Sequence, residues 1–177
     1  MKEIELERTF LAKYLPKGYQ KSPHKEIFDI YVPFNEKHPV MRIRKRGDLY
    51  EITKKSPIKD GDASEQEEHT IKLTKKEFEA FKNVKGKNVR KIRYYYDYSG
   101  MKAEIDVFKD DLKGLVLVDF EFKDVKAKGC FQMPDFCLAD VTQEEVFAGG
   151  MLCGKKYSNI KAVLNKLGYK RIENSRR

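Results

Sequence analysis

Short segments in which charged and apolar residues alternate recur along the chain. Near the N-terminus Glu5 and Glu7 alternate with Ile4 and Leu6, and similar segments follow later. In a β-strand, residues two apart project from the same face. An alternation of period two is therefore typical of strands with one polar and one apolar face, and it predicts an antiparallel β-structure.

Several of the polar faces carry a pair of charges of the same sign. The acidic pairs are Glu5/Glu7, Glu104/Asp106 and Asp119/Glu121, and the basic pairs are Arg42/Arg44 and Lys91/Arg93. Like charges this close on one face repel each other, unless the faces converge on an enclosed site. Carboxylates are ligands that Mg²⁺ or Mn²⁺ prefers, and guanidinium and ammonium groups bind phosphate. The pattern favours a closed barrel with a metal–polyphosphate site, and an exposed sheet face stays an alternative.

A few helices are expected between the strands. Capping boxes at Thr74–Glu77 and Thr142–Glu145 predict two helix starts. Ser158 is a third candidate cap, and Gly168 is placed to end that helix. Many strands with few helices indicate an α+β domain.

Composition narrows the classes of protein. The 177 residues fit a single domain over 1–177, with a basic, flexible segment at 169–177. Eleven Phe and ten Tyr argue against disorder. No apolar run is long enough to span a bilayer, so we expect no membrane association.

The charge and the cysteines suggest partners and location. The net charge of +9 favours polyanionic partners. Nucleic acid is an alternative partner that we do not favour, because many of the basic side chains alternate along strands and lie close to acidic side chains. The N-terminal segment lacks the apolar core of a secretory signal, and three cysteines without metal-site spacing are expected as reduced thiols in a cytoplasmic protein.

Seven short motifs in order resemble the CYTH, or triphosphate tunnel metalloenzyme, family. They are Glu5–Leu11, Arg42–Arg44, Ile52–Ser56, Lys91–Tyr94, Glu104–Phe108, Gly114–Glu121 and Asp140–Thr142. The resemblance implies a closed antiparallel β-barrel of about eight strands, whose tunnel is lined by these charges. It also implies one or two Mg²⁺ or Mn²⁺ ions as cofactors.

The resemblance implies a role for each inward-facing charge. The implied metal ligands are Glu5, Glu7, Glu104, Asp106, Asp119 and Glu121. The implied phosphate-binding residues are Arg42, Arg44, Lys55, Lys91 and Arg93. We expect Lys55, Glu104 and Asp106 to take part in catalysis.

The chain departs from the family pattern at three places. Thr9 replaces the signature lysine and removes a cation. Gln66 and Thr70 replace an arginine and a glutamate around Glu68, and the segment 147–150 lacks the usual Tyr and Asn. These changes leave metal and phosphate binding in place and open the question of the substrate.

Four further charged residues, and three tyrosines, are expected to lie outside the site. Glu3, Lys45, Arg46 and Lys54 are expected to be solvated, and Tyr94, Tyr95 and Tyr96 are expected to pack in the core.

The expected function is metal-dependent hydrolysis of the terminal phosphoryl group of a triphosphate, with inorganic triphosphate preferred over a nucleoside or organic triphosphate. The alternatives are a class IV type of adenylyl cyclase and a non-catalytic barrel that binds polyphosphate or RNA ends. A monomer and a homodimer are both compatible with the sequence.

Overall fold

The computed structural model describes residues 2–59, 61–81 and 83–173, and these contain one nine-stranded sheet. The strands are β1 (Lys2–Ala12), β2 (His24–Val32), β3 (Met41–Arg46), β4 (Leu49–Pro57), β5 (Glu65–Leu73), β6 (Lys87–Tyr98), β7 (Met101–Phe108), β8 (Val116–Glu121) and β9 (Cys137–Asp140).

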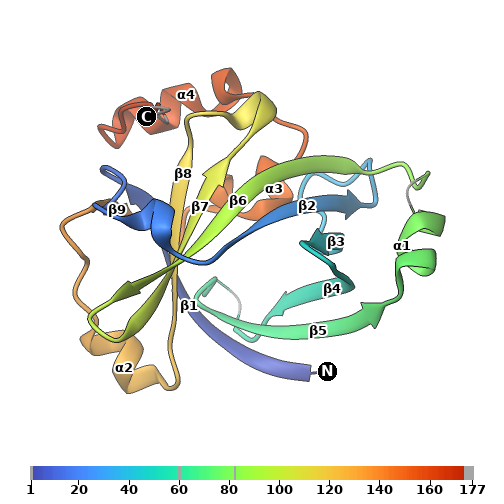
Figure 1. Ribbon diagram of the computed structural model, residues 1–177, viewed down its shortest axis with the longest axis horizontal. Coiled ribbons are helices and arrows are strands. Elements are labelled where there is room, and N and C mark those ends of the chain that lie inside the picture. The colour runs from blue at the N-terminus through green and yellow to red at the C-terminus, as the bar shows by residue number, and fades with distance from the viewer. Residues whose placement is uncertain (1, 60, 82, 174–177) are drawn as a thin grey trace.

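The sheet closes on itself. Its strand order is β5-β4-β3-β2-β6-β7-β8-β1-β9, all pairings are antiparallel, and a further β1–β5 pairing joins the ends (Figure 1). Strands β1 to β8 thus form a closed eight-stranded barrel, and β9 extends it beside β1. The predicted closed antiparallel barrel is confirmed.

Strand β1 closes the barrel because it is long enough to pair with different neighbours along its length. Its first half, Lys2–Leu6, pairs with β5. Its second half, Glu7–Leu11, pairs with β8 on the other edge, and its last residues also pair with β9. Among the described strands, closure leaves no long edge exposed.

The outward faces of β7 and β8 are apolar and largely buried, as the alternation predicts. Phe10 and Phe120 are fully buried on neighbouring strands, with ring centroids 6.1 Å apart. Helices cover parts of the barrel wall: α1 (Lys75–Phe81), α2 (Val125–Cys130) and α4 (Tyr157–Lys166) (Figure 1). None of the helices in the described part of the chain is long and apolar enough to cross a membrane.

One end of the barrel interior is apolar. The inward positions of β1 and β8 change from carboxylates to Leu11 and Leu117, and these pack in one buried cluster with Phe147 and Leu152. Phe147 ends the short 3-10 helix η3 (Glu145–Phe147), and Leu152 ends α3 (Gly149–Leu152). Two further 3-10 turns are η1 (Tyr19–Lys21) and η2 (Asp110–Leu112).

The predicted helix starts have three different outcomes. At α1 the capping box is present, with Thr74 N donating to Glu77 Oε2 over 2.6 Å. The prediction of a capping box at Thr142–Glu145 is wrong, because the Thr142 hydroxyl instead accepts a hydrogen bond from Thr9 N of β1 at 3.0 Å. At α4 the cap is formed by Lys156 N and Asn159 rather than by Ser158.

The expected flexible segment 169–177 needs a correction in its first part. Tyr169 is buried, and its hydroxyl accepts from Val116 N at 2.8 Å and donates to Gly114 O at 2.9 Å. Ile172 N also donates to Gly114 O at 3.0 Å. Residues 169–172 are therefore held against the start of β8, and residues 174–177 of that prediction lie outside the described residues.

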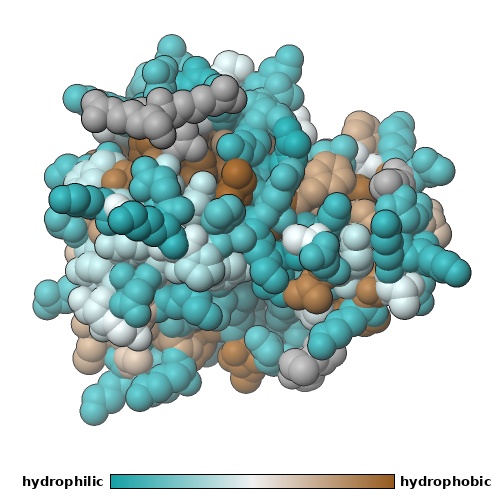
Figure 2. Space-filling model, viewed as in Figure 1, coloured by the Kyte–Doolittle hydropathy of each residue, from teal (hydrophilic) through white to brown (hydrophobic). Residues whose placement is uncertain are grey.

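The surface around the barrel is largely hydrophilic. Figure 2 shows charged and polar side chains over most of the visible face, with apolar residues scattered among them. The three cysteines are free, as predicted, with Cys137 and Cys153 buried and Cys130 exposed.

We predict that Tyr169→Phe destabilises the protein. The change leaves the buried Val116 N–H without its acceptor, so the free energy of unfolding should fall by about 1 to 3 kcal/mol. Urea unfolding followed by circular dichroism measures this loss. The control is Tyr14→Phe, because Tyr14 is exposed; equal losses in the two variants would contradict the role given to the Tyr169 hydroxyl.

Candidate functional site

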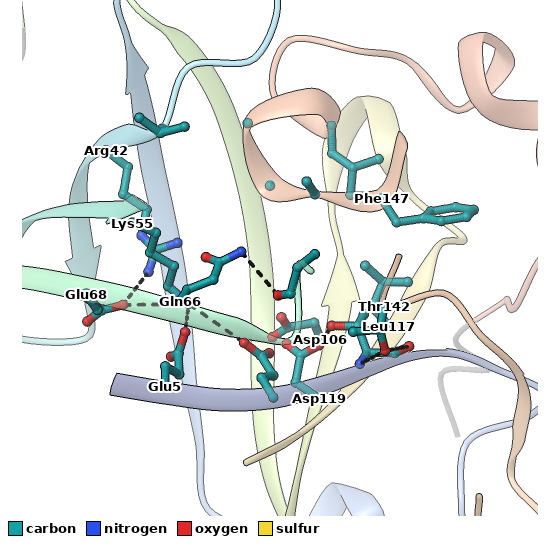
Figure 3. Close-up of a pocket in the computed structure, with 18 of the residues that line it drawn as sticks. Glu5, Arg42, Lys55, Gln66, Glu68, Asp106, Leu117, Asp119, Thr142 and Phe147 are labelled. Atoms are coloured by element: carbon teal, nitrogen blue, oxygen red, sulfur yellow. Dashed lines mark hydrogen bonds and ion pairs between the residues drawn. The ribbon is translucent and has the colours of Figure 1, made fainter. Parts of the chain in front are cut away.

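The inward faces of the strands surround one cavity of about 1010 Å³. Every residue that the sequence predicts for the site lines it: Glu5, Glu7, Arg42, Arg44, Lys55, Lys91, Arg93, Glu104, Asp106, Asp119 and Glu121. Figure 3 shows side chains from several strands directed into this space. The period-two alternation brings them together, because closing the sheet turns every polar face inward.

Arg93 on β6 is the most heavily engaged cation of the wall. It forms ion pairs with Glu104, with Asp106 (Nη2 to Oδ2 2.6 Å) and with Asp119 (Nη2 to Oδ2 2.9 Å). Lys91 also pairs with Asp106. Burial alone would raise the pKa of Asp106, but the two cations hold it well below its usual range. Asp106 is therefore ionised and oriented by β6.

Arg44 on β3 is held by a residue that the sequence reading missed. Its Nε and Nη2 donate to Asp29 Oδ1 and Oδ2 at 2.7 and 2.8 Å, a two-pronged pair in which Asp29 is only 1% exposed. Asp29 lies on β2 opposite Arg44. The signal was an acid between buried Ile27 and Tyr31 on the same face of the strand.

Lys55 on β4 faces three carboxylates from two neighbouring strands (Figure 3). Its ammonium group pairs with Glu5 and lies 3.7 Å from Glu7 Oε2 and 3.6 Å from Glu68 Oε2. Burial lowers the pKa of Lys55, but Glu7 and Glu5 together leave it above its ordinary value. Lys55 therefore stays charged inside the barrel.

Four carboxylates on β1, β7 and β8 have an excess of negative charge around them. Burial raises the pKa of Glu7, Glu104, Asp119 and Glu121, and neighbouring carboxylates raise each pKa further. Nearby cations offset only part of this effect. These groups supply hard oxygen donors, and a bound divalent cation would relieve their mutual repulsion.

The donor set therefore fits Mg²⁺ or Mn²⁺ in its chemistry. Among the described residues, no group of three or more His, Cys, Asp or Glu side chains is gathered as a ready-made metal site. Several of the carboxylates pair with Arg93 or Lys55 instead. The ligand roles given to them stay predictions.

Thr9 occupies the position of the family's signature lysine. Its hydroxyl donates to Asp119 Oδ1 at 2.9 Å. This gives one neutral hydrogen bond where a lysine would bring a charge, and the pKa of Asp119 stays raised, mainly through burial.

Two residues expected to lie outside the site line the cavity. Glu3 is exposed at its edge, and Arg46 faces Glu51 Oε2 at 3.5 Å. Glu3 is solvated as expected, but the expectation that both residues lie outside the cavity was wrong, because the alternation continues beyond the segments recognised as motifs. Lys45 and Lys54 are exposed as expected.

The three consecutive tyrosines of β6 have different surroundings. Tyr94 and Tyr96 pack against the apolar cluster outside the barrel, as predicted. The Lys102 ammonium lies 5.8 Å from the centre of the Tyr95 ring.

The sequence also missed a second set of residues that line the cavity. These are Tyr31, Glu51 and Lys72 on strands, His38 and Gln143 on connecting segments, and Gly149 at the start of α3. Glu51 shares the parity of Lys55 on β4, and Lys72 continues the parity of Glu68 and Thr70 on β5. The connecting segments carry no periodic signal, so their position depends on the fold.

Comparison with known proteins gives relatives for this arrangement. An inorganic triphosphatase of Nitrosomonas europaea is 30% identical over 143 residues, which cover 80% of this chain and 91% of that protein. The chain belongs to the CYTH, or triphosphate tunnel metalloenzyme, family. The prediction of a triphosphatase-type enzyme is confirmed at this level, although no family model matches the chain.

Other relatives agree with the assignment to the CYTH family. An inorganic triphosphatase of Acetivibrio thermocellus is 30% identical over 73 residues, 41% of this chain and 46% of that one. The crystal structure of the inorganic triphosphatase NE1496 superposes with a TM-score of 0.63 at 27% identity, covering 85% of this chain and 95% of that chain. An adenylate cyclase candidate from Bacillus halodurans shares the fold, with a TM-score of 0.54 at 14% identity, over 99% and 96% of the two chains.

We predict that Asp29→Asn weakens this CYTH barrel. The change leaves the Arg44 charge buried without its counter-ion, which should cost about 3 kcal/mol of unfolding free energy. The pKa of Asp29 is lowered in the folded state, so its contribution is complete at neutral pH. The contribution is lost as the pH falls below about 4, through the folded pKa.

Urea unfolding at several pH values tests this prediction. The difference between the unaltered protein and Asp29→Asn should be largest near pH 7 and should shrink in acid. Asp48→Asn serves as the control, because Asp48 is exposed. A difference that stays constant down to acidic pH would refute the assignment.

Proposed function

We propose that this protein hydrolyses the terminal phosphoryl group of a triphosphate in a reaction that depends on Mg²⁺ or Mn²⁺. The supporting observation is that cationic and carboxylate side chains line one cavity. Two family members with this type of sequence are named inorganic triphosphatases. Phosphoryl transfer depends mainly on positioning and on charge stabilisation, and this cavity supplies groups for both.

The cationic side chains bind and orient the phosphates in this proposal. Arg42, Arg44, Lys55, Lys91 and Arg93 offset the charge of the substrate. Arg93 is fixed in direction by three carboxylates, so little reorganisation is needed when phosphoryl oxygens approach it. Lys55 can donate to a phosphoryl oxygen in exchange for one of its three carboxylates.

The carboxylates of β1, β7 and β8 would hold the divalent cation. Glu7, Glu104, Asp119 and Glu121 are candidates because burial raises the pKa of each, and Glu5 and Asp106 complete the proposed set. When bound, the ion would polarise phosphoryl oxygens and lower the pKa of water. Glu104 and Asp106 would orient the attacking water in the same region.

Inorganic triphosphate is the proposed substrate. Among the described lining residues charged and polar side chains dominate, and the chain has no tryptophan to stack on a base. The aromatic lining residues Tyr31, Phe108 and Phe147 lie at the apolar end and are buried in the core. We further propose a cytoplasmic location, where polyphosphates are available to the enzyme.

We predict that Glu7→Gln abolishes metal-dependent phosphate release. Metal catalysis contributes several kcal/mol of charge stabilisation, and each ~1.4 kcal/mol changes the rate tenfold. The loss should therefore exceed about 100-fold. The measurement is release of orthophosphate from triphosphate with Mg²⁺ or Mn²⁺.

The matched control for this variant is Glu26→Gln, which removes an exposed carboxylate outside the cavity. It should release phosphate at the rate of the unaltered protein. Full activity in Glu7→Gln would show that the site has been assigned wrongly.

A substrate and metal screen separates the proposal from its alternatives. Phosphate release from inorganic triphosphate should stop with EDTA, resume with Mg²⁺ or Mn²⁺, and exceed release from ATP, GTP or thiamine triphosphate. Cyclic AMP and pyrophosphate from ATP would indicate the cyclase instead. Tight triphosphate binding without turnover in either metal would indicate a binding protein, which the missing cation at Thr9 makes worth testing.

A further inference from the structure

Strand β3 places three arginines on the inner wall, and they differ in how firmly they are held. Arg44 is saturated by Asp29 through two short hydrogen bonds. Arg42 has only a long contact from Nη1 to Tyr31 Oη at 3.5 Å and an ion pair with Glu68 at 3.6 Å. The charge of Arg44 is therefore neutralised within the wall, and that of Arg42 is largely available.

Arg46 resembles Arg42 in this respect. Its one ion pair in the described part of the chain joins Nη2 to Glu51 Oε2 at 3.5 Å. The Nε atoms of Arg42 and Arg46 are buried and lack a hydrogen-bond partner, and in the described ranges they are the two such side-chain atoms. A buried donor without an acceptor is unfavourable, so both arginines are placed to accept an anionic ligand.

The two arginines lie on either side of the neutral Arg44–Asp29 pair. They are four positions apart on the strand, which is about 13 Å between Cα atoms. Arg42 pairs with Thr53 of β4 and lies near Glu68 and Lys55. Arg46 pairs with Ile27 of β2, whose other neighbour is Lys91. The wall thus presents positive charge at two points with a neutral region between them.

We propose that Arg42 and Arg46 bind the two ends of one linear phosphate chain of three or more units that lies along β3. Arg46 is then a specificity-determining residue that distinguishes such a chain from pyrophosphate. This inference rests on the proposed function and extends it, since the sequence motif pointed to Arg42 and Arg44 as the pair. Arg44, already bound to Asp29, lies between the two contacts and should contribute less to phosphate binding than either of them.

The proposed selectivity depends on whether the phosphate chain is long enough to contact both guanidinium groups. Arginine stems are long and flexible, so two guanidinium groups can bend toward the ends of one chain. A short anion reaches one of them and gains the same from that contact whether or not the other is present. A longer chain contacts both and should lose affinity when either is removed.

The test is direct binding of sodium triphosphate and sodium pyrophosphate to Arg46→Gln, Arg46→Lys and the unaltered protein. Isothermal titration calorimetry is done in EDTA and separately with Ca²⁺. We expect Arg46→Gln to weaken triphosphate binding at least tenfold and pyrophosphate binding less than twofold. Arg46→Lys keeps the charge, and its affinity for triphosphate should lie between those of Arg46→Gln and the unaltered protein. Pyrophosphate that fails to bind even the unaltered protein also supports the proposal.

Lys45→Gln is the matched control, because Lys45 is the next residue of β3 and faces solvent. It removes the same charge and should leave both affinities unchanged. The inference is overturned if Arg46→Gln binds triphosphate normally, if it loses both ligands equally, or if Lys45→Gln shows the same loss. Triphosphate that binds the unaltered protein in neither condition overturns it as well.

Hydrolysis is measured separately with Mg²⁺ and Mn²⁺, so that the two proposals can fail independently. Selective loss of triphosphate binding in Arg46→Gln, together with no turnover in the unaltered protein, would refute the hydrolase and keep the chain-length site. Normal turnover in the unaltered protein, with no effect of Arg46→Gln on triphosphate binding, would keep the hydrolase and refute the chain-length site.

Discussion

The rest of the structure depends on the pairing of opposite charges inside a closed wall. Burying ionised groups is unfavourable unless each has a counter-charge and hydrogen bonds. Arg93 with its three carboxylates, and Arg44 with Asp29, meet that condition across neighbouring strands. These pairs fix the direction of the side chains. Side chains with only long contacts, such as Arg42 and Arg46, are more available to a ligand.

The inner wall divides into regions of different chemistry. Cations come from β3, β4 and β6, and carboxylates with raised pKa values come from β1, β7 and β8; Arg93 of β6 pairs directly with Glu104 and Asp119. The end near Leu11 is filled by apolar side chains from η3 and α3. In the proposed function, a polyphosphate and a divalent cation would meet among these cationic and carboxylate side chains, next to the apolar end of the barrel.

The segment 147–150 departs from the family pattern, and close packing explains its two glycines. A Cβ at Gly149 would lie 2.1 Å from Tyr31 Oη, and one at Gly150 would lie 2.2 Å from Pro39 O. Glycine alone lets α3 approach β2 and the 38–40 segment this closely. Because Tyr31 also contacts Arg42, this packing connects the apolar end of the barrel with the arginines of β3.

The sequence by itself determined the strand faces and the sign of charge on each, because side chains alternate strictly along a strand. All eleven predicted site residues, from Glu5 to Glu121, reach one cavity for that reason. The tertiary structure alone decided which charges are already paired. Asp29 forms a two-pronged ion pair with Arg44, and Arg46 lines the cavity. Thr142 accepts a hydrogen bond from β1 instead of capping a helix. These contacts join residues on different strands or segments, and their distances are set by barrel closure and register, on which local periodicity carries no information.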